Sequence, residues 1–346
     1  MVQHDINEQV RLAIWNTTGT RLTSIFTDIF RVPVQEPITI NIYEPLADPD
    51  AVVFNQIKFD NSRRNIFILF SGEGHSEREY NIVFDRFKTD SDFAIVDEKD
   101  IIIHTSALAL LTDKYHHITN LSGIIGVTLK LSGSRIEFNP VDKHYVCLNR
   151  ENRWHRQWLV EEIHRRNLQK FGLVSYLNIP EKTTMPELYP LVVDMPSVTH
   201  DQGYELNDPI RKAAINIITE TSFENDLGQI SAPGVTEKTF KSILLCQFPL
   251  FVSSYKTVYH YRMLGFDVFD DVIDHSYDLI EDPQERLECI MDTLRKICGR
   301  PWAYYHHLRE DMLDRFYDNY KMMERYIDLS FETKAWHDKF QEMKVL

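Results

Sequence analysis

Cysteines are few and scattered in this sequence. The 346 residues include four of them, Cys147, Cys246, Cys289 and Cys298, and no two form a CxxC pair. This spacing argues against a zinc site of the CxxC type and against the disulfide framework of a small secreted domain. We therefore expect a protein of a reducing compartment.

Long apolar runs are absent as well. No uninterrupted apolar stretch reaches the length of a membrane-spanning helix, and the N-terminal MVQHDINEQVRLAIW lacks the basic start and apolar stretch of a signal peptide. The sequence thus predicts a cytoplasmic protein with no membrane partner.

Positive charge is in short supply. The chain has 38 Lys and Arg residues against 52 Asp and Glu residues, for a formal net charge of -14. Such a charge repels polyanions at long range, so binding of DNA or RNA would need a local basic patch. Net charge alone does not exclude it.

Apolar side chains are plentiful, and their arrangement indicates an α/β protein. Hydrophobic residues make up 43% of the chain and aromatic residues 12%, enough for folded cores, and the length suits two lobes. Short apolar runs alternate with helical patterns, as expected of parallel sheets. In the first half we expect strands at 38–45, 65–75 and 92–106, a helix at 76–88 and a hairpin at 126–138.

The second half repeats the alternation and ends in helices. We expect strand, helix and strand across 144–176, an irregular stretch over 178–209, two further strand–helix pairs across 213–265, and helices from 282 onward. These patterns predict an N-terminal α/β lobe over 1–143, a second α/β lobe over 144–281, and a C-terminal helical segment over 282–346 that packs on the lobes.

A basic cluster follows the first strand of the second lobe. In LNRENRWHR, Arg150, Arg153, His155 and Arg156 lie after a strand and at a helix start. Positive side chains there oppose the helix dipole, and anion binding would explain their placement. The alternative is an exposed basic turn that pairs with the abundant acidic residues.

A second polar cluster lies in ITETSFENDLGQISAPGVTEKTF. A strand ends at Glu220, a loop follows, and a helix begins at Thr236, Glu237 and Lys238. Glu237 can accept hydrogen bonds from ribose hydroxyls while Lys238 neutralises a phosphate. Alternatively, Thr236 is an N-cap and Glu237 complements the helix dipole. Both interpretations can hold together.

The sequence FEN, the loop after it and VTEKTFKSILLCQFPLFVSS together resemble the donor-binding motif of the α-1,3-fucosyltransferase family. LNRENRWHRQWLVEEIHRR resembles the first strand and helix of the donor lobe in glycosyltransferase-like proteins of phages and large DNA viruses. The two resemblances cover roughly the middle third of the chain and occur in the same order.

This resemblance implies a GT-B fold, with two Rossmann-like lobes facing across a cleft, and metal-independent transfer of a sugar from a nucleotide-sugar. It implies that Glu237 binds the donor ribose and Lys238 the diphosphate, with Arg153 or Arg156 as a second phosphate contact. Phe223, Glu224 and Asn225 would lie against the nucleoside or the sugar. The remaining predicted donor-binding residues are Arg150, His155, Glu220 and Thr236. The loop DLGQISAPG lacks the tyrosine common in fucosyltransferases, so the resemblance does not specify fucose.

An inverting transfer also needs a general base near the acceptor hydroxyl. Glu73 and His75 are our candidates, because they lie in the glycine-flanked loop FSGEGH after a predicted buried strand. The alternative is an ordinary βα turn with solvated polar groups. His104 is a substitute candidate for the base.

We expect no cofactor or metal beside the nucleotide-sugar, with UDP or GDP as its nucleotide. The acid-rich FDVFDDVIDHSYDLIED does not match a calcium-binding loop and is expected to be a solvated acidic face. We expect the acceptor to be either a hydroxymethylated base in phage DNA or a glycan. With phage DNA as acceptor, the protein would work in the host cytoplasm. A non-catalytic nucleotide- or sugar-binding module remains the alternative function.

Overall fold

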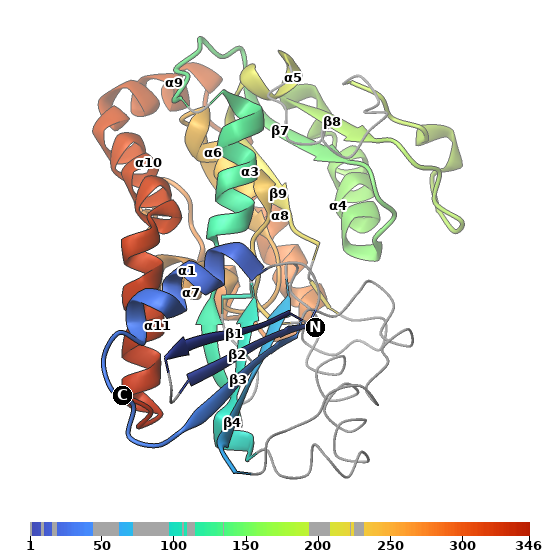
Figure 1. The fold of residues 1–346 in the computed structure, drawn as a ribbon. Helices are drawn as coiled ribbons and strands as arrows, with labels where there is room; N and C mark the ends of the chain where they lie inside the picture. The colour runs from blue at the N-terminus through green and yellow to red at the C-terminus, as the bar shows by residue number, and fades with distance from the viewer. Residues whose placement is uncertain are drawn as a thin grey trace. The chain divides into compact units, whose positions relative to one another are not determined.

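The computed structural model describes residues 2–7, 10–15, 19–43, 62–71, 97–105, 107–108, 115–133, 135–193, 208–221, 223–224 and 232–346 (Figure 1). The chain forms two compact units. Unit 1 contains Met1–Gly123 and Arg325–Leu346, and unit 2 contains Ile124–Glu324. Each unit is a mixed α/β structure built on its own sheet, in agreement with the predicted two-lobed α/β class.

Unit 1 is built on a six-stranded sheet with the order β1-β2-β3-β4-β5-β6. Its strands after β1 are parallel, and β1 pairs with β2 in the antiparallel direction. The predicted strands at 38–45 and 65–75 are confirmed as β3 and β4, and β5 lies within the predicted 92–106. The strands are β1 (Val2–Asn7), β2 (Val10–Trp15), β3 (Ile38–Tyr43), β4 (Arg64–Ser71), β5 (Ile101–Thr105) and β6 (His116–Thr119), and β5 follows the short 3₁₀ helix η4 (Glu98–Asp100).

The core of unit 1 joins the two ends of the chain. Helix α1 (Gly19–Ile29) packs against α11 (Leu329–Glu342), the last helix of the chain (Figure 1). The rings of Phe26 and Trp336 lie 5.0 Å apart edge to face, and both side chains are buried. Because α11 supplies this half of the aromatic core, the last helix belongs to the N-terminal unit.

The hairpin predicted at 126–138 is wrong. Helix α3 (Ser122–Ser132) occupies most of it, and Asn120 Oδ1 accepts a hydrogen bond from the Ser122 backbone N–H at 3.2 Å. The buried residues of α3 recur at intervals of three to four positions, which is the spacing of one face of a helix. They are Ile125, Thr128, Leu129 and Ser132. The β-branched residues and Gly133 suggested strands, but the burial pattern follows a helix. The helix predicted at 76–88 lies outside the described residues.

Unit 2 is built on a parallel four-stranded sheet with the order β10-β9-β7-β8. The strand and helix predictions for 144–176 and 213–265 are confirmed. The strands are β7 (Lys143–Asn149), β8 (Gly172–Tyr176), β9 (Ala213–Thr219) and β10 (Phe248–Val252). The helices are α4 (Trp154–Arg165), α5 (Asp208–Arg211), α6 (Glu237–Leu244), α7 (Thr257–Met263), α8 (Pro283–Cys298), α9 (Trp302–Asp311) and α10 (Leu313–Ile327), with 3₁₀ helices η5 (Gln169–Phe171), η6 (Pro186–Leu188) and η8 (Ser276–Leu279).

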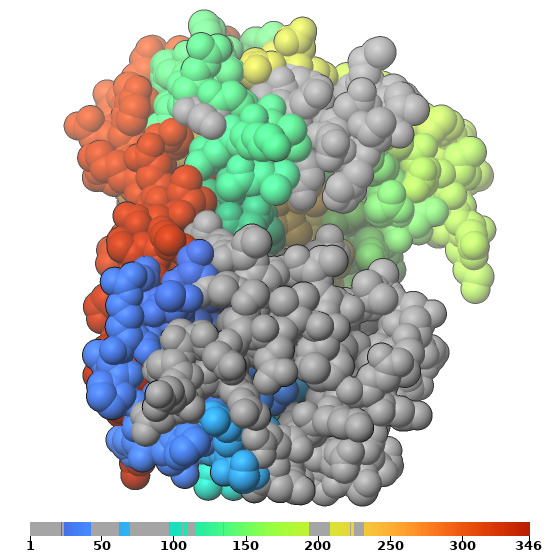
Figure 2. Space-filling view, in the orientation of Figure 1, coloured from blue at the N-terminus to red at the C-terminus, as the bar shows by residue number. Residues whose placement is uncertain are grey.

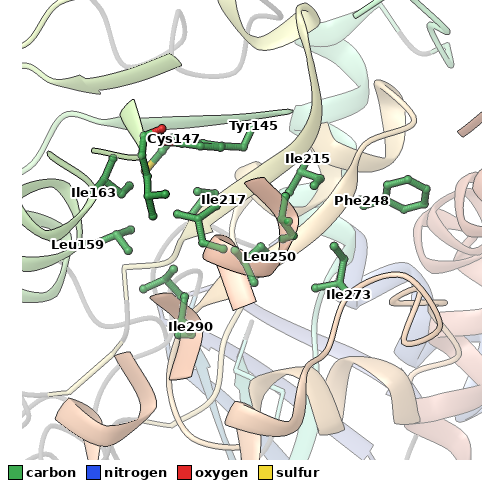
Figure 3. Close-up of a cluster of buried hydrophobic side chains, with 14 of the residues drawn as sticks. Tyr145, Cys147, Leu159, Ile163, Ile215, Ile217, Phe248, Leu250, Ile273 and Ile290 are labelled. Carbon is green, nitrogen blue, oxygen red and sulfur yellow. Dashed lines mark hydrogen bonds between the residues drawn. The ribbon is translucent and has the colours of Figure 1, made fainter. Parts of the chain in front are cut away.

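Helices cover both faces of this sheet. Cys147, Ile217 and Leu250 of three strands point toward Leu159 of α4 and Ile290 of α8 (Figure 3). The next strand residue points the other way because side chains alternate along a strand, and the Phe251 ring lies 5.7 Å from Tyr261 of α7. Strand β9 is buried at every position, as its unbroken apolar sequence predicts for a central parallel strand.

The segment after β8 is irregular, as predicted, apart from η6. It lies at the surface of unit 2, where Figure 2 shows it in yellow-green and where Ile179 is 65% exposed. Glu161 of α4 holds this segment, because its carboxylate accepts hydrogen bonds from the Thr183 and Thr184 hydroxyls at 2.8 and 2.7 Å. The surface loop is thus fastened to α4.

Candidate functional site

The sheet of unit 2 reverses its winding direction between β7 and β9. From β7 the chain moves to β8 on one side and later to β9 on the other side. All four strands are parallel, so the loops after β7 and β9 leave from the same edge and turn apart. Ligands of open α/β sheets bind at such a point. Arg150 and Glu220, the first residues after these two strands, place both predicted polar clusters there.

Asn149 ties the ends of the strands together. Its side-chain oxygen accepts a hydrogen bond from the Thr219 hydroxyl at 2.6 Å, and its amide nitrogen donates to the Ser175 backbone oxygen at 3.4 Å. Asn149 therefore links β7 to β9 and β8 at the switch point. Asn149 was not predicted as a site residue, although an amide at the end of an apolar strand is a recognisable signal.

His155 and Arg156 face the protein interior. The His155 ring nitrogen Nε2 donates to the Glu220 backbone oxygen at 3.1 Å, because a carbonyl can only accept, and Arg156 Nη2 donates to the Thr219 backbone oxygen at 3.0 Å. Burial lowers the pKa of His155 to about 3, so the ring is neutral. Burial also lowers the pKa of Arg156, against the opposing effect of Glu220. Both side chains hold the start of α4 on the end of β9.

Arg150 and Arg153 lie on the outer side of the same turn. Arg150 is half-buried and Arg153 is exposed, and neither guanidinium makes an ion pair with any residue that the structure describes. Arg153 is the N-cap residue of α4, yet its side chain makes no capping hydrogen bond, and the first turn of the helix contains no acidic residue. The start of α4 therefore combines a helix N-terminus with an available cation.

Glu220 is buried at 0% exposure and joins the two helix starts. Its Oε1 accepts hydrogen bonds from the Thr236 backbone N–H at 3.0 Å and from the Thr239 hydroxyl at 2.7 Å, both at the start of α6. Its backbone oxygen accepts from His155 of α4. Glu220 therefore has a structural role in the site, where a contact with the donor was predicted.

Glu237 and Lys238 at the start of α6 pair with each other. Lys238 Nζ lies 3.0 Å from Glu237 Oε1 and donates to the Thr236 hydroxyl at 3.2 Å. Burial raises the pKa of Glu237, but the charges of Lys238 and Lys241 outweigh it and the net shift is downward, so Glu237 is ionised. Thr236 occupies the N-cap position without making a side-chain cap. The predicted ribose and phosphate contacts are therefore adjacent and already charged.

Phe223 has no free ring face. The His155 ring stacks on it at 4.7 Å with an interplanar angle of 13°, and the Arg286 guanidinium lies 4.6 Å from its centre. Phe223 is 0% exposed, so its ring packs inside the protein and cannot stack on a ligand. Arg286, which the sequence analysis did not single out, is 1% exposed and donates through Nη1 to the Ile280 backbone oxygen at 2.7 Å.

Glu224 is a carboxyl group of the site with a raised pKa. Burial raises its pKa to about 7, Arg286 opposes this shift, and Asp282 adds to it. Its buried Oε1 has no hydrogen-bond partner among the described residues. Glu224 can therefore hold or release a proton near neutral pH.

The structure describes His104 but neither of the two main candidates for the catalytic base. Glu73 and His75 lie outside the described residues, as does Asn225 of the donor-binding prediction. His104, the substitute candidate, is 1% exposed in β5, with Nε2 3.8 Å from Glu332 and its ring 5.1 Å from Trp336. His104 is therefore part of the unit 1 core.

The acid-rich segment 266–282 is neutralised by basic side chains and helix starts. Asp270 pairs with Arg262 at 2.9 Å, Asp271 pairs with Arg315 at 2.8 Å, and Asp278 accepts hydrogen bonds from two backbone N–H groups of α7. No group of three or more His, Cys, Asp or Glu residues in the described part of the chain could hold a metal ion. Of the helices that the structure describes, none has both the length and the hydropathy for crossing a bilayer.

No family model matches the sequence, and no curated protein is significantly similar to it. The geometry of the β7–β9 switch point is therefore the basis for inferring a function.

Proposed function

We propose that this protein is a glycosyltransferase that takes a sugar from a nucleotide-sugar and transfers it to a hydroxyl acceptor. Unit 2 is the donor-binding unit in this proposal, and the two α/β units correspond to the two lobes of a GT-B enzyme. Transfer is inverting and needs no metal. The expected nucleotide is UDP or GDP.

The observation that carries the proposal is the convergence of two helix starts on Glu220. Glu220 bonds to His155 of α4 through its backbone and to Thr236 of α6 through its side chain. The neighbouring residues Arg153 and Lys238 therefore both belong to the β7–β9 switch point. Two cations and a helix N-terminus at one sheet edge suit a diphosphate.

The chain's own side chains can supply the electrostatic part of the reaction. Negative charge grows on the diphosphate as the sugar leaves, and fixed positive groups stabilise it. Arg153 and Lys238 would do this directly. Arg156 is buried and would act by positioning the start of α4. The ionised Glu237 beside Lys238 can accept hydrogen bonds from the ribose.

The binding half of the proposal is tested by calorimetry with UDP, GDP and their sugars in the presence of EDTA. We expect wild-type protein to bind at least one of them. Arg153→Ala and Lys238→Ala should each weaken binding about tenfold or more, since each removes a charged contact. Arg300→Ala is the matched control, because Arg300 is also exposed but lies beside His144, at the amino end of β7. Failure of every nucleotide to bind, or equal effects of all three variants, would contradict the proposal.

The catalytic half is tested by donor hydrolysis and by transfer to oligonucleotides with hydroxymethylated bases or to glycans. Transfer to DNA or to a glycan identifies the acceptor. Donor binding without hydrolysis or transfer to either acceptor would instead support the non-catalytic binding module.

A further inference from the structure

Trp154 is an exposed aromatic residue at the switch point that the proposed function has not used. It is the first residue of α4 and is 43% exposed. Side chains of a helix lean toward its N-terminus, so the indole at the first position extends past the helix start toward the turn at Arg153. A large apolar surface thus lies beside an available cation.

The indole is held in one orientation by buried rings. Its centre lies 5.4 Å from the Phe223 ring at an angle of 80° and 6.1 Å from the His155 ring at 85°. Phe223 is itself fixed between His155 and Arg286. These edge-to-face contacts orient Trp154 while much of its surface stays open to solvent.

The neighbourhood of Trp154 selects one class of ligand. The first turn of α4 has no acidic residue and no side-chain cap, and Arg153 has no ion-pair partner within the described chain. An anion is therefore favoured within a few ångströms of a flat aromatic surface. A nucleotide carries both features, a planar base and a phosphate.

We propose that Trp154 stacks on the base of the donor nucleotide, while Arg153 and the start of α4 hold its phosphates. This inference rests on the proposed function, since it assigns the base to the same site. It makes Trp154 the residue that distinguishes a nucleotide from a bare diphosphate. Stacking tolerates any base, so Trp154 strengthens binding of GDP and UDP alike.

Calorimetry with GDP, UDP and inorganic pyrophosphate separates the base from the phosphates. Trp154→Ala should weaken GDP and UDP binding about tenfold or more and leave pyrophosphate binding within about twofold of wild type. Trp154→Phe should retain most of the nucleotide affinity. The matched control is Trp302→Ala, because Trp302 is also the first residue of its helix and is 38% exposed.

Fluorescence gives a second readout. A base that stacks on Trp154 should quench its emission, so GDP should quench wild-type protein more than Trp154→Phe, and pyrophosphate should quench neither. If wild type binds no nucleotide, the proposed function fails and this inference fails with it. If wild type binds nucleotides and Trp154→Ala binds them equally well, or loses pyrophosphate binding to the same extent, only the role of Trp154 is overturned.

Discussion

Helices α4 and α9 of unit 2 begin in the same way, but they begin at opposite ends of strand β7. Each starts with an exposed tryptophan, Trp154 or Trp302, and neither has a side-chain cap or an acidic residue in its first turn. Arg153 and Pro301 occupy the two N-cap positions in extended conformations. Local sequence therefore makes these helix starts look equivalent.

The sheet makes them different. The backbone oxygen of Arg300, just before α9, lies 2.6 Å from His144 Nε2, which places α9's start at the amino end of β7. The start of α4 follows the carboxyl end of β7, roughly 20 Å away along the strand. Only the carboxyl ends of parallel strands diverge at the switch point. An uncapped helix start thus suggests a ligand at α4 and not at α9.

Other helices show the ordinary way to satisfy a helix start. The Asp282 side chain accepts a hydrogen bond from the Glu285 backbone N–H of α8, and Asp328 does the same for Ser330 of α11. These caps satisfy N–H groups that an anion could otherwise bind. Three kinds of substitution test the difference between α4 and α9. The first removes the buried Glu220, the second replaces the ionisable residues His155 and Glu224, and the third adds a side-chain cap at Arg153.

The largest effect is expected from removing Glu220, which supports α4 and α6 together. Glu220→Ala leaves the Thr236 backbone N–H and the Thr239 hydroxyl without their buried acceptor, and it removes one of the two carboxylates, Glu220 and Glu237, that stabilise the charge of Arg156. We expect the free energy of unfolding to fall by about 2–4 kcal/mol, measured by urea denaturation.

Glu288→Ala is the control for this prediction, because Glu288 is 48% exposed in its pair with Arg166. It should change the free energy of unfolding by less than about 1 kcal/mol. Equal stability of the two variants would show that Glu220 does not support the site.

A smaller effect on stability is expected from two ionisable residues, His155 and Glu224. Their contributions to the free energy of unfolding depend on pH in opposite directions. The unfolded chain protonates His155 below its ordinary pKa of 6.5, while the folded protein keeps it neutral down to about 3, so stability is lost as pH falls through this window. The folded protein keeps Glu224 protonated up to about 7, above the ordinary 4.5, so stability is lost as pH rises from 4.5 to 7.

Glutamine substitutions separate these contributions. His155→Gln should remove the loss on the acid side, and Glu224→Gln should remove the loss between pH 4.5 and 7. Urea midpoints measured from pH 4 to 8 check both slopes, and unchanged slopes in both variants would contradict the assigned burial. His144→Gln is the control, because His144 lies at the other end of β7.

The smallest effect is expected from closing the α4 start. Arg153→Asp supplies the missing cap and should stabilise the free protein by about 0.5–1 kcal/mol while weakening nucleotide binding. Pro301→Asp caps α9 but loses the rigidity of proline, so its net gain should be smaller and its nucleotide affinity unchanged. Thermal unfolding and calorimetry measure both quantities. A weaker nucleotide affinity in Pro301→Asp would remove the distinction between the two helix starts.

The strands of unit 2 were predictable because each is a short apolar run bounded by polar turns. The 126–138 segment was predicted wrongly because isoleucine, valine and threonine suit strands locally, whereas the buried face of α3 has helical spacing. The place of α11 could not be predicted, since a helical pattern does not specify which sheet it covers. Trp336 and Phe340 enter the core of unit 1 across about 300 residues of sequence.

The positions of the site residues were easier to predict from the sequence than their roles. Arg153 and Lys238 lie at the strand exits where the sequence placed them, and their contacts with a phosphate remain a prediction. His155, Arg156 and Glu220 were predicted to meet a ligand, and in the structure they bond to the protein. Charge and spacing do not tell whether a polar side chain points outward or inward.

The sequence alone determined the alternation of strands and helices and the polar residues at the strand ends of unit 2, because periodicity and turn chemistry are local. Tertiary structure decided which helix starts are equivalent, which side chains are buried, and that Trp154 alone of the matched pair lies at the switch point. These depend on strand order, and strand order arises from contacts between residues far apart in the chain.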